Sequence, residues 1–184
     1  IITIGIYKFR DGFLYYLGFK TDKYANELSA DERKLTDIRI YEVLHKHDNK
    51  AIGFDVSEYQ SEIDWEQTYH IDEAFELSFV FIRSTAGKDK IDSKFKENWK
   101  AAKERQLIRG AYHYYRPNEN SIEQAENFIK TVKLQKGDLP PVLDIEKLPK
   151  SQSIDSLKVG LRRWLNRVEK HYKVKPIIYS GESY

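Results

Sequence analysis

The amino-acid sequence predicts an α/β fold in which a parallel sheet curls into an irregular, TIM-like β/α barrel. From Ala51 onward, short apolar segments alternate with amphipathic helical segments, as in parallel sheets joined by right-handed crossovers. Polar residues gather at the carboxyl ends of the apolar segments, where a barrel carries its functional groups. No Gly-rich turn follows the first apolar segment, which disfavours a doubly wound open sheet.

Each expected element follows from a local pattern, because short apolar runs predict strands and apolar residues spaced three or four apart predict helices. Strands are expected at Ala51–Val56, Phe79–Ser84, Ile108–Tyr115, Val142–Ile145 and Lys175–Ser180. Helices are expected at Ile63–Leu77, at Ser93–Arg105, after the capping box Ser121-Ile122-Glu123-Gln124, and at Ile154–Tyr172. Inward-facing side chains are expected in the helix after the capping box at Ile122, Ala125, Phe128, Ile129 and Val132. The chain stops just after the fifth strand, so we expect a barrel truncated at about that point.

Residues 1–50 have a different character from residues 51–184, the expected barrel domain. They carry a charged run and no strong strand pattern, and the spacing of apolar residues in Asp37–His47 predicts a short helix. We therefore expect 1–50 to be a membrane-proximal stalk or anchor remnant. The apolar stretch Ile1–Tyr7 is followed by Lys8 and Arg10. It is either the trailing end of a membrane anchor or an edge strand.

Composition narrows the class of partner. The 31 basic and 29 acidic residues leave a net charge of +2, which provides no field for nucleic acid. The chain has no cysteine, which removes disulfides, thiolate metal sites and cysteine nucleophiles. Its 13 tyrosines are flat amphipathic rings that suit sugar faces as well as protein cores.

The most informative segment is the run from Pro140 to Glu146. Its apolar residues predict a buried strand, and alternation places Asp144 and Glu146 on one face with Cα atoms roughly 6.6 Å apart. Carboxylates at the end of a core strand are costly unless they are used. A carboxylate pair held in different environments is what cleavage of a glycosidic bond needs.

Asp55, at the end of the first expected strand, would meet Asp144 and Glu146 at one mouth of a barrel. Such a cluster could bind a divalent metal ion, but metal ligands of this kind usually cluster in one loop or include histidine. It could also perform acid–base chemistry on a sugar. Further polar residues are expected to face the same mouth: Arg83, Tyr112, Tyr114 and Tyr179.

A series of motifs resembles the family-25 glycoside hydrolases, the N-acetylmuramidase lysozymes, over about residues 51–184. The motifs occur in the family's order: Gly53-Phe54-Asp55-Val56-Ser57-x-x-Gln60, Ile63-Asp64-Trp65, Phe81-Ile82-Arg83-Ser84-Thr85-Ala86-Gly87, Asp92-x-x-Phe95-x-x-Asn98, Gly110-Ala111-Tyr112-His113-Tyr114-Tyr115-Arg116-Pro117, the Asp-x-Glu strand, and Pro176-Ile177-Ile178-Tyr179-Ser180. The ordered set is specific, whereas Asp-x-Glu alone would be weak. Where the family often has histidine after the opening serine, this chain has Glu58.

The resemblance implies cleavage of the β-1,4 bond after N-acetylmuramic acid in peptidoglycan. It implies that Glu146 is the general acid and that Asp144 orients or charge-stabilises the 2-acetamido group or assists attack at the anomeric carbon. Asp55 would hold the hydrogen bonds of the site and help keep Glu146 protonated. Tyr112, Tyr114 and Tyr179 would contact sugar, and Arg83 would neutralise the acids or contact a substrate carboxylate.

The resemblance also implies no cofactor and no metal, and it implies glycan strands of peptidoglycan as the partner. We expect a monomer that is secreted or membrane-anchored and faces the cell envelope. The family's domain continues through further strands to another acidic site residue, which these 184 residues do not include. Two alternatives stay open: a non-catalytic glycan-binding module on the same fold, and a glycosidase that cleaves chitin-like chains through the substrate's own acetamido group.

Overall fold

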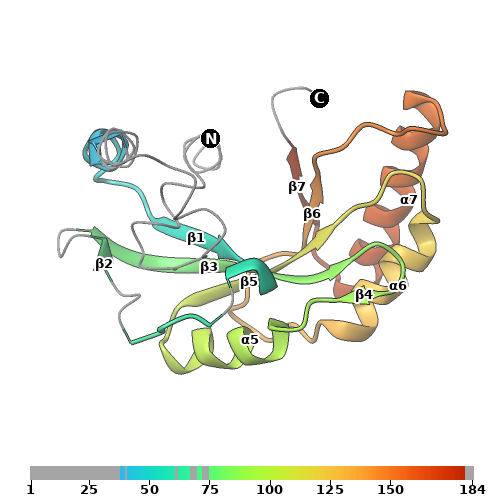
Figure 1. The fold of residues 1–184 in the computed structure, drawn as a ribbon. Helices are drawn as coiled ribbons and strands as arrows, with labels where there is room; N and C mark the ends of the chain where they lie inside the picture. The colour runs from blue at the N-terminus through green and yellow to red at the C-terminus, as the bar shows by residue number, and fades with distance from the viewer. Residues whose placement is uncertain (1–37, 40, 61, 67–69, 72–74, 181–184) are drawn as a thin grey trace.

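The computed structural model describes most of the chain from Ile38 onward. The described residues are 38–39, 41–60, 62–66, 70–71 and 75–180. They form a curled sheet whose outer side is covered by helices (Figure 1). Residues 1–37 lie outside the described part, and so does the predicted anchor or edge strand Ile1–Tyr7.

The sheet confirms the predicted α/β half-barrel. Its parallel strands lie side by side in chain order: β1 (Ile52–Val56), β3 (Phe75–Ala86), β5 (Ile108–Tyr114), β6 (Val142–Ile145) and β7 (Ile177–Ser180). Since each strand pairs with the next one along the chain, this order winds in one direction, as in a barrel. A doubly wound sheet would reverse direction partway.

Helices α5 (Phe95–Glu104), α6 (Ser121–Thr131) and α7 (Ile154–Tyr172) lie along the convex side of the sheet (Figure 1). Their apolar stripes cover the outward-facing side chains of the strands. The most deeply buried of these include Val80, Ile82, Ala111, Leu143 and Ile145 from the strands and Phe128, Trp164 and Val168 from the helices. The core therefore sits outside the curl, and the polar strand-end residues lie on the inner face.

The predicted helix at Ile63–Leu77 is wrong. Phe75–Leu77 belong to β3, and the short strand β2 (His70–Ile71) pairs antiparallel with them. In the described residues between β1 and β3, the helical structure is the 3-10 turn η1 (Glu58–Gln60). Ile63 and Trp65 instead pack against the core, with the Trp65 ring 6.1 Å from that of Phe54. Tertiary contacts explain the apolar spacing that had suggested a helix.

Helix α6 begins as predicted but is capped differently. The N-cap is Asn120, whose side chain accepts hydrogen bonds from the backbone N–H groups of Ile122 and Glu123. The buried stripe therefore includes two polar residues, Ser121 and Gln124, and Ile122 lies off it with 40% of its surface exposed. The prediction that Ile122 faces inward is wrong.

The remaining elements match their predictions to within a few residues, and a second short strand, besides β2, was not predicted. Strand β4 (Lys90–Ile91) pairs antiparallel with the end of β3. This hairpin folds the chain back across the carboxyl end of β3. It thereby places Lys90 and Asp92 near the start of η1, where both contact Glu58.

The N-terminal part contributes to the same core. Residues 38–39 and 41–46 are helical, as the spacing in Asp37–His47 predicted. Leu44 is buried among the core residues. None of the helices in the described part of the chain has both the length and the apolar character needed to cross a membrane.

On the inner face, glycine allows two aromatic rings to lie close to neighbouring strands. The ring of Phe79 packs over Gly53, and the ring of Phe81 packs over Gly110. A Cβ atom on Gly53 would lie 2.5 Å from the carbonyl oxygen of Phe79, so alanine does not fit there. Asp55 is two residues further along β1, and its placement depends on this close approach.

Candidate active site

The inner face carries a row of predicted site residues. Asp144 on β6 lies between Tyr114 of β5 and Tyr179 of β7 in the strand register. Paired residues of neighbouring parallel strands point to the same face, so these three side chains share the inner face. Asp144 is buried, with 6% of its surface exposed, and Glu146 follows one residue beyond the end of β6.

Tyr112 links this row to Asp55. Burial raises the pKa of the Tyr112 hydroxyl well above its ordinary value. The carboxylates of Asp55 and Asp144 raise the same pKa further, whereas the charge of Arg83 lowers it. The strand register gives the geometry: Tyr112 pairs with Arg83, and Asp55 pairs with Phe81, two residues before Arg83 on β3. Asp55 of β1 and Asp144 of β6, which are far apart in the sequence, therefore lie on the same inner face.

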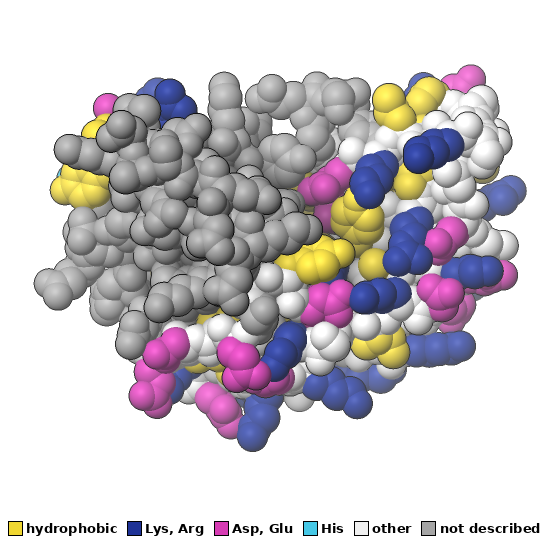
Figure 2. All heavy atoms as spheres, viewed as in Figure 1, with side chains coloured by type: hydrophobic (Ala, Val, Ile, Leu, Met, Phe, Trp, Pro, Cys, Tyr) yellow, Lys and Arg dark blue, Asp and Glu magenta, His cyan; other side chains and the backbone are white. Residues whose placement is uncertain are grey.

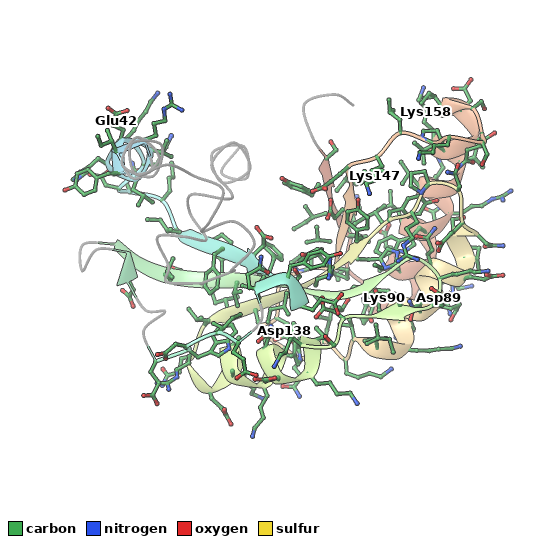
Figure 3. All side chains as sticks on the ribbon, in the orientation of Figure 1. Glu42, Asp89, Lys90, Asp138, Lys147 and Lys158 are labelled. Carbon is green, nitrogen blue, oxygen red and sulfur yellow. The ribbon has the colours of Figure 1, made fainter. Side chains whose placement is uncertain are left out.

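Glu146 lies at the same edge of the sheet and is half-buried. The next residue, Lys147, places its ammonium group 5.8 Å from the centre of the Tyr114 ring. Figure 3 shows Lys147 beside the ends of β6 and β7. The acid Glu146 and the cation Lys147 thus follow each other along the chain just beyond the row of inner-face residues. A general acid needs such a position, at the open end of a buried strand.

Arg83 lies at the carboxyl end of β3, the edge where it was predicted. The acids that bind its guanidinium, however, are not the predicted site acids. Its Nε donates to Asp92 at 2.8 Å, and its Nη2 donates to Glu58 at 3.1 Å. Its guanidinium carbon lies 4.4 Å from the centre of the Tyr59 ring. Only 7% of the Arg83 side chain is exposed. These contacts orient the guanidinium, and Arg83 interacts with Tyr112 through its charge alone.

Glu58 is the hub of this ion network. Burial alone would raise the pKa of its carboxyl, but hydrogen bonds from Lys90 and Ser93 and the charge of Arg83 outweigh burial and lower that pKa to about 2. Lys90 Nζ lies 2.6 Å from the carboxylate, and Ser93 donates to it from both its backbone N–H and its hydroxyl. Glu58 is therefore a fixed anion at neutral pH.

Sequence analysis missed the ligands of Arg83. Glu58 and Tyr59 lie within the first motif, and Asp92 opens a later one, yet none of them was assigned to the site. A hairpin predicted after β3 would have indicated Asp92 as a partner of Arg83, because Thr85 and Ala86 pair with Ile91 and Lys90. The hairpin brings Asp92 back to the carboxyl end of the sheet.

Behind the site, the outer face of β5 carries a buried hydrogen-bonded histidine. Gln124 donates from its amide nitrogen to the carbonyls of Arg116 and Glu119, so its amide oxygen faces His113 Nε2 at 3.1 Å. That oxygen only accepts, so Nε2 carries the proton and Nδ1 accepts from the Thr85 hydroxyl at 2.8 Å. Burial lowers the pKa of His113 to about 4. His113 is thus a neutral bridge between β3, β5 and α6.

A cleft of about 530 Å³ opens between the loops that follow β5 and β6. It is lined by Tyr115, Asn120, Gln152, Gly160 and Arg163, among other residues. A Cβ atom on Gly160 would lie 2.8 Å from the Tyr115 hydroxyl, so a larger residue would crowd that hydroxyl. The cleft is lined mainly by the start of α6 and by α7, which cover the convex side of the sheet (Figure 1), whereas Asp55 and Asp144 belong to the inner face.

Hydrophobic and acidic side chains lie side by side at the centre of the face in Figure 2, where η1 and the carboxyl ends of the strands are seen in Figure 1. Among the residues that the structure describes, no group of three or more histidines and acids stands close enough to hold a metal ion. The arrangement is a buried aspartate, a second aspartate across the sheet, a half-buried glutamate and several tyrosines. Acid–base chemistry on a polyhydroxy ligand is what such a set performs.

Comparison with known proteins agrees with this geometry. The family model for glycosyl hydrolases family 25 matches residues 54–184. The chain belongs to that family. It is 42% identical over 130 residues to the uncharacterized protein YegX of Escherichia coli (strain K12), and 33% identical over 141 residues to lysozyme M1 of Streptomyces globisporus. These matches cover 70% and 72% of this chain and 47% of each relative, so the chain spans about half the length of those proteins.

A solved structure of a family 25 glycosyl hydrolase from Bacillus anthracis has the same fold. It superposes with a TM-score of 0.64 at 32% sequence identity, covering 71% of this chain and 60% of that one. A bacterial lysozyme from Streptomyces coelicolor superposes with a TM-score of 0.62 at 29% identity, covering 72% of this chain and 64% of that one. The curled parallel sheet is therefore the family fold.

Proposed function

We propose that the protein is a peptidoglycan hydrolase that cleaves the β-1,4 bond between N-acetylmuramic acid and N-acetylglucosamine. The observation that carries the proposal is the placement of Asp55 of β1 and Asp144 of β6 on the same inner face of the sheet, through the register of the strands between them. Family membership and the 33% identity to a lysozyme support the substrate class. The proposal places the protein at the cell envelope, either secreted or anchored.

In the proposed reaction, Glu146 protonates the leaving glycosidic oxygen. Its place just beyond β6 keeps it half-buried, near the open end of the row. Asp144 is held in the buried row and would orient or charge-stabilise the 2-acetamido group or assist attack at the anomeric carbon. Asp55 supplies negative charge from β1, which would stabilise the positive charge that develops on the sugar ring.

The tyrosines and Arg83 complete the proposed site. Tyr114 and Tyr179 flank Asp144 in the register, where their rings would border the sugar. Tyr112 would hold the two aspartates apart and contact the substrate through its hydroxyl. Arg83 balances the carboxylates through its charge, since its guanidinium is already bound to Asp92 and Glu58.

The test is mass spectrometry of the products released from purified peptidoglycan by the full-length protein. Fragments with N-acetylmuramic acid at the new reducing end are expected from the wild type. Glu146→Gln should lose about 10²-fold or more of that activity, because it removes the proton donor and keeps the size of the side chain. A loss of only a few-fold would refute the assignment of Glu146.

The matched control is Glu104→Gln, at the last residue of α5, whose side chain is exposed and pairs with Lys100. Helix α5 ends just before β5 begins, so Glu104 lies at the opposite edge of the sheet from the acids. Glu104→Gln should leave product formation unchanged.

Binding of muropeptides without product release would favour a glycan-binding module on the same fold. The observation that keeps this second candidate is the pair of tyrosines that flank Asp144 in the strand register, because flat aromatic rings also suit sugar binding without cleavage. Products from chitin oligomers in place of peptidoglycan would instead indicate a chitin-cleaving glycosidase. A binding module leaves no fragments, whereas each hydrolase leaves fragments of its own substrate.

A further inference from the structure

Tyr59 is a large aromatic residue that the sequence motifs leave without a role. It lies in η1, directly after β1 and four residues after Asp55, and 67% of its surface is exposed. A single exposed aromatic side chain needs no explanation when it is mobile. Tyr59 differs, because several contacts hold it in place.

The ring of Tyr59 is supported from one side by Arg83. The guanidinium carbon lies 4.4 Å from the ring centre, in cation–π geometry. The guanidinium itself is fixed by Asp92 at 2.8 Å and by Glu58 at 3.1 Å. One face of the ring therefore rests on a buried cation. The large exposed fraction means that the other face is open to solvent.

The backbone beneath the ring is fixed as well. Glu58 N–H donates to the Asp92 carboxylate at 2.9 Å, and Tyr59 N–H donates to the Ser57 hydroxyl at 3.3 Å. The Gln60 side chain accepts from Ser57 N–H, and Gln60 N–H donates to the Ser57 carbonyl. Because the turn is ordered before any ligand arrives, a ligand that stacks on Tyr59 loses little affinity to the ordering of the side chain.

Tyr59 also adjoins the candidate active site. Arg83 contacts the Tyr59 ring and pairs with Tyr112 in the strand register. Asp55 pairs with Phe81, two residues before Arg83 on β3, so the exposed ring and Asp55 lie at the same end of the sheet. A glycan strand bound at the acids would extend past this rim.

We propose that the open face of Tyr59 is a sugar-binding platform that stacks on a neighbouring N-acetylhexosamine ring of the glycan strand. This inference rests on the proposed function for the identity of the ligand. A flat, amphipathic ring suits the apolar face of a pyranose, and a ring on a fixed base positions it. Tyr59 positions the strand and takes no part in proton transfer. The Arg83–Asp92–Glu58 network holds the platform in place.

The test measures binding apart from cleavage. Calorimetric titration of the full-length Glu146→Gln protein with soluble oligomers of N-acetylglucosamine and N-acetylmuramic acid gives a dissociation constant. Adding Tyr59→Ala should raise that constant about tenfold, which corresponds to about 1.4 kcal/mol. Tyr59→Phe and Tyr59→Trp should keep it within about threefold, because each retains a flat ring.

Tyr59→Leu tests whether Tyr59 stacks on a sugar ring or only covers the guanidinium of Arg83. Leucine still covers the guanidinium but offers no flat face, so it should weaken binding as much as alanine does. If Tyr59→Leu binds as wild type, Tyr59 only covers Arg83 and the proposal is wrong. Tyr41→Ala is the matched control, since Tyr41 is another exposed tyrosine, with 45% of its surface exposed, on the N-terminal helical segment. It should bind as the parent protein does.

The outcomes distinguish this proposal from the proposed function. Unchanged binding by Tyr59→Ala, together with cleavage that depends on Glu146, overturns the platform and leaves the muramidase standing. Binding that depends on Tyr59, with no cleavage by the wild type, supports the platform and refutes the muramidase. Absence of oligomer binding by every variant overturns the platform. In the active protein, Tyr59→Ala should raise KM more than it lowers kcat.

Discussion

His113 Nε2 lies 3.1 Å from the amide oxygen of Gln124, and this contact fixes the histidine as a neutral donor within the core. The His113 ring also stacks on Trp164 of α7, with ring centres 5.5 Å apart. Strand β5 is thereby tied to α6 and α7 on the face opposite the tyrosines. The inner row depends on this packing, because His113 lies between Tyr112 and Tyr114 in the strand.

The stability of the fold should therefore depend on pH through His113. Burial lowers its pKa from 6.5 to about 4 in the folded protein, so between these values the unfolded chain binds a proton that the folded chain does not. The free energy of unfolding should fall as pH decreases through this window, by about 2 kcal/mol between pH 7 and pH 5. Urea denaturation at a series of pH values measures the fall.

Two variants identify the histidine responsible. His113→Gln should be less stable at pH 7 but should lose most of the dependence on pH between 7 and 5. His171→Gln, at an exposed position in the last turn of α7, should keep the dependence of the wild type. Equal slopes in the two variants would contradict the assignment to His113.

Asp92→Asn should destabilise the fold. It removes the carboxylate that contacts Arg83 at 2.8 Å, and both side chains of this pair are almost fully buried. Glu58 remains as a partner, but the guanidinium loses its shorter contact, so the expected cost is about 3 kcal/mol. Chemical denaturation checks this value. Glu62→Gln breaks the exposed pair with Lys94 and should leave the denaturation midpoint unchanged, because exposed pairs are screened by solvent.

Tyr112→Phe should affect the reaction more than the fold. The carboxylates of Asp55 and Asp144 raise the pKa of the Tyr112 hydroxyl, and removal of this hydroxyl should lower kcat/KM for peptidoglycan about tenfold, as expected for one lost polar interaction in the transition state. Tyr172→Phe provides the opposite pattern. Its hydroxyl donates to the Val132 carbonyl at 3.0 Å on the outer side, so this change should lower stability by about 1 kcal/mol and leave the rate unchanged. Identical effects of the two variants on the rate would contradict this role of Tyr112.

The elements that the sequence predicted well are those whose pattern reflects a single buried face. Helix α7 begins and ends at the predicted residues, and β6 does too, because each has a clear apolar stripe or run. The predicted helix at Ile63–Leu77 was wrong, since its apolar residues are divided between core contacts of a loop and the start of β3. Spacing alone does not distinguish these two origins.

The same distinction applies to the candidate site. Alternation along β6 and the order of the strands were enough to predict that Asp144 and Asp55 lie on one face at one edge. The partners of Arg83 were not predictable in this way. Asp92 and Glu58 reach it through the β3–β4 hairpin and the turn η1, and neither has the long periodic pattern that allows prediction.

By itself, the sequence determined the α/β half-barrel, the family and the set of acids at the strand ends, because local periodicity and chain order specify which face a residue occupies. Only the tertiary structure decided how those residues are partnered. It bound Arg83 to Asp92 and Glu58, paired Arg83 with Tyr112 in the strand register, and held the ring of Tyr59 open on a buried cation. These contacts join segments distant in the chain, and their geometry depends on how the hairpin and the turn pack, which no local pattern encodes.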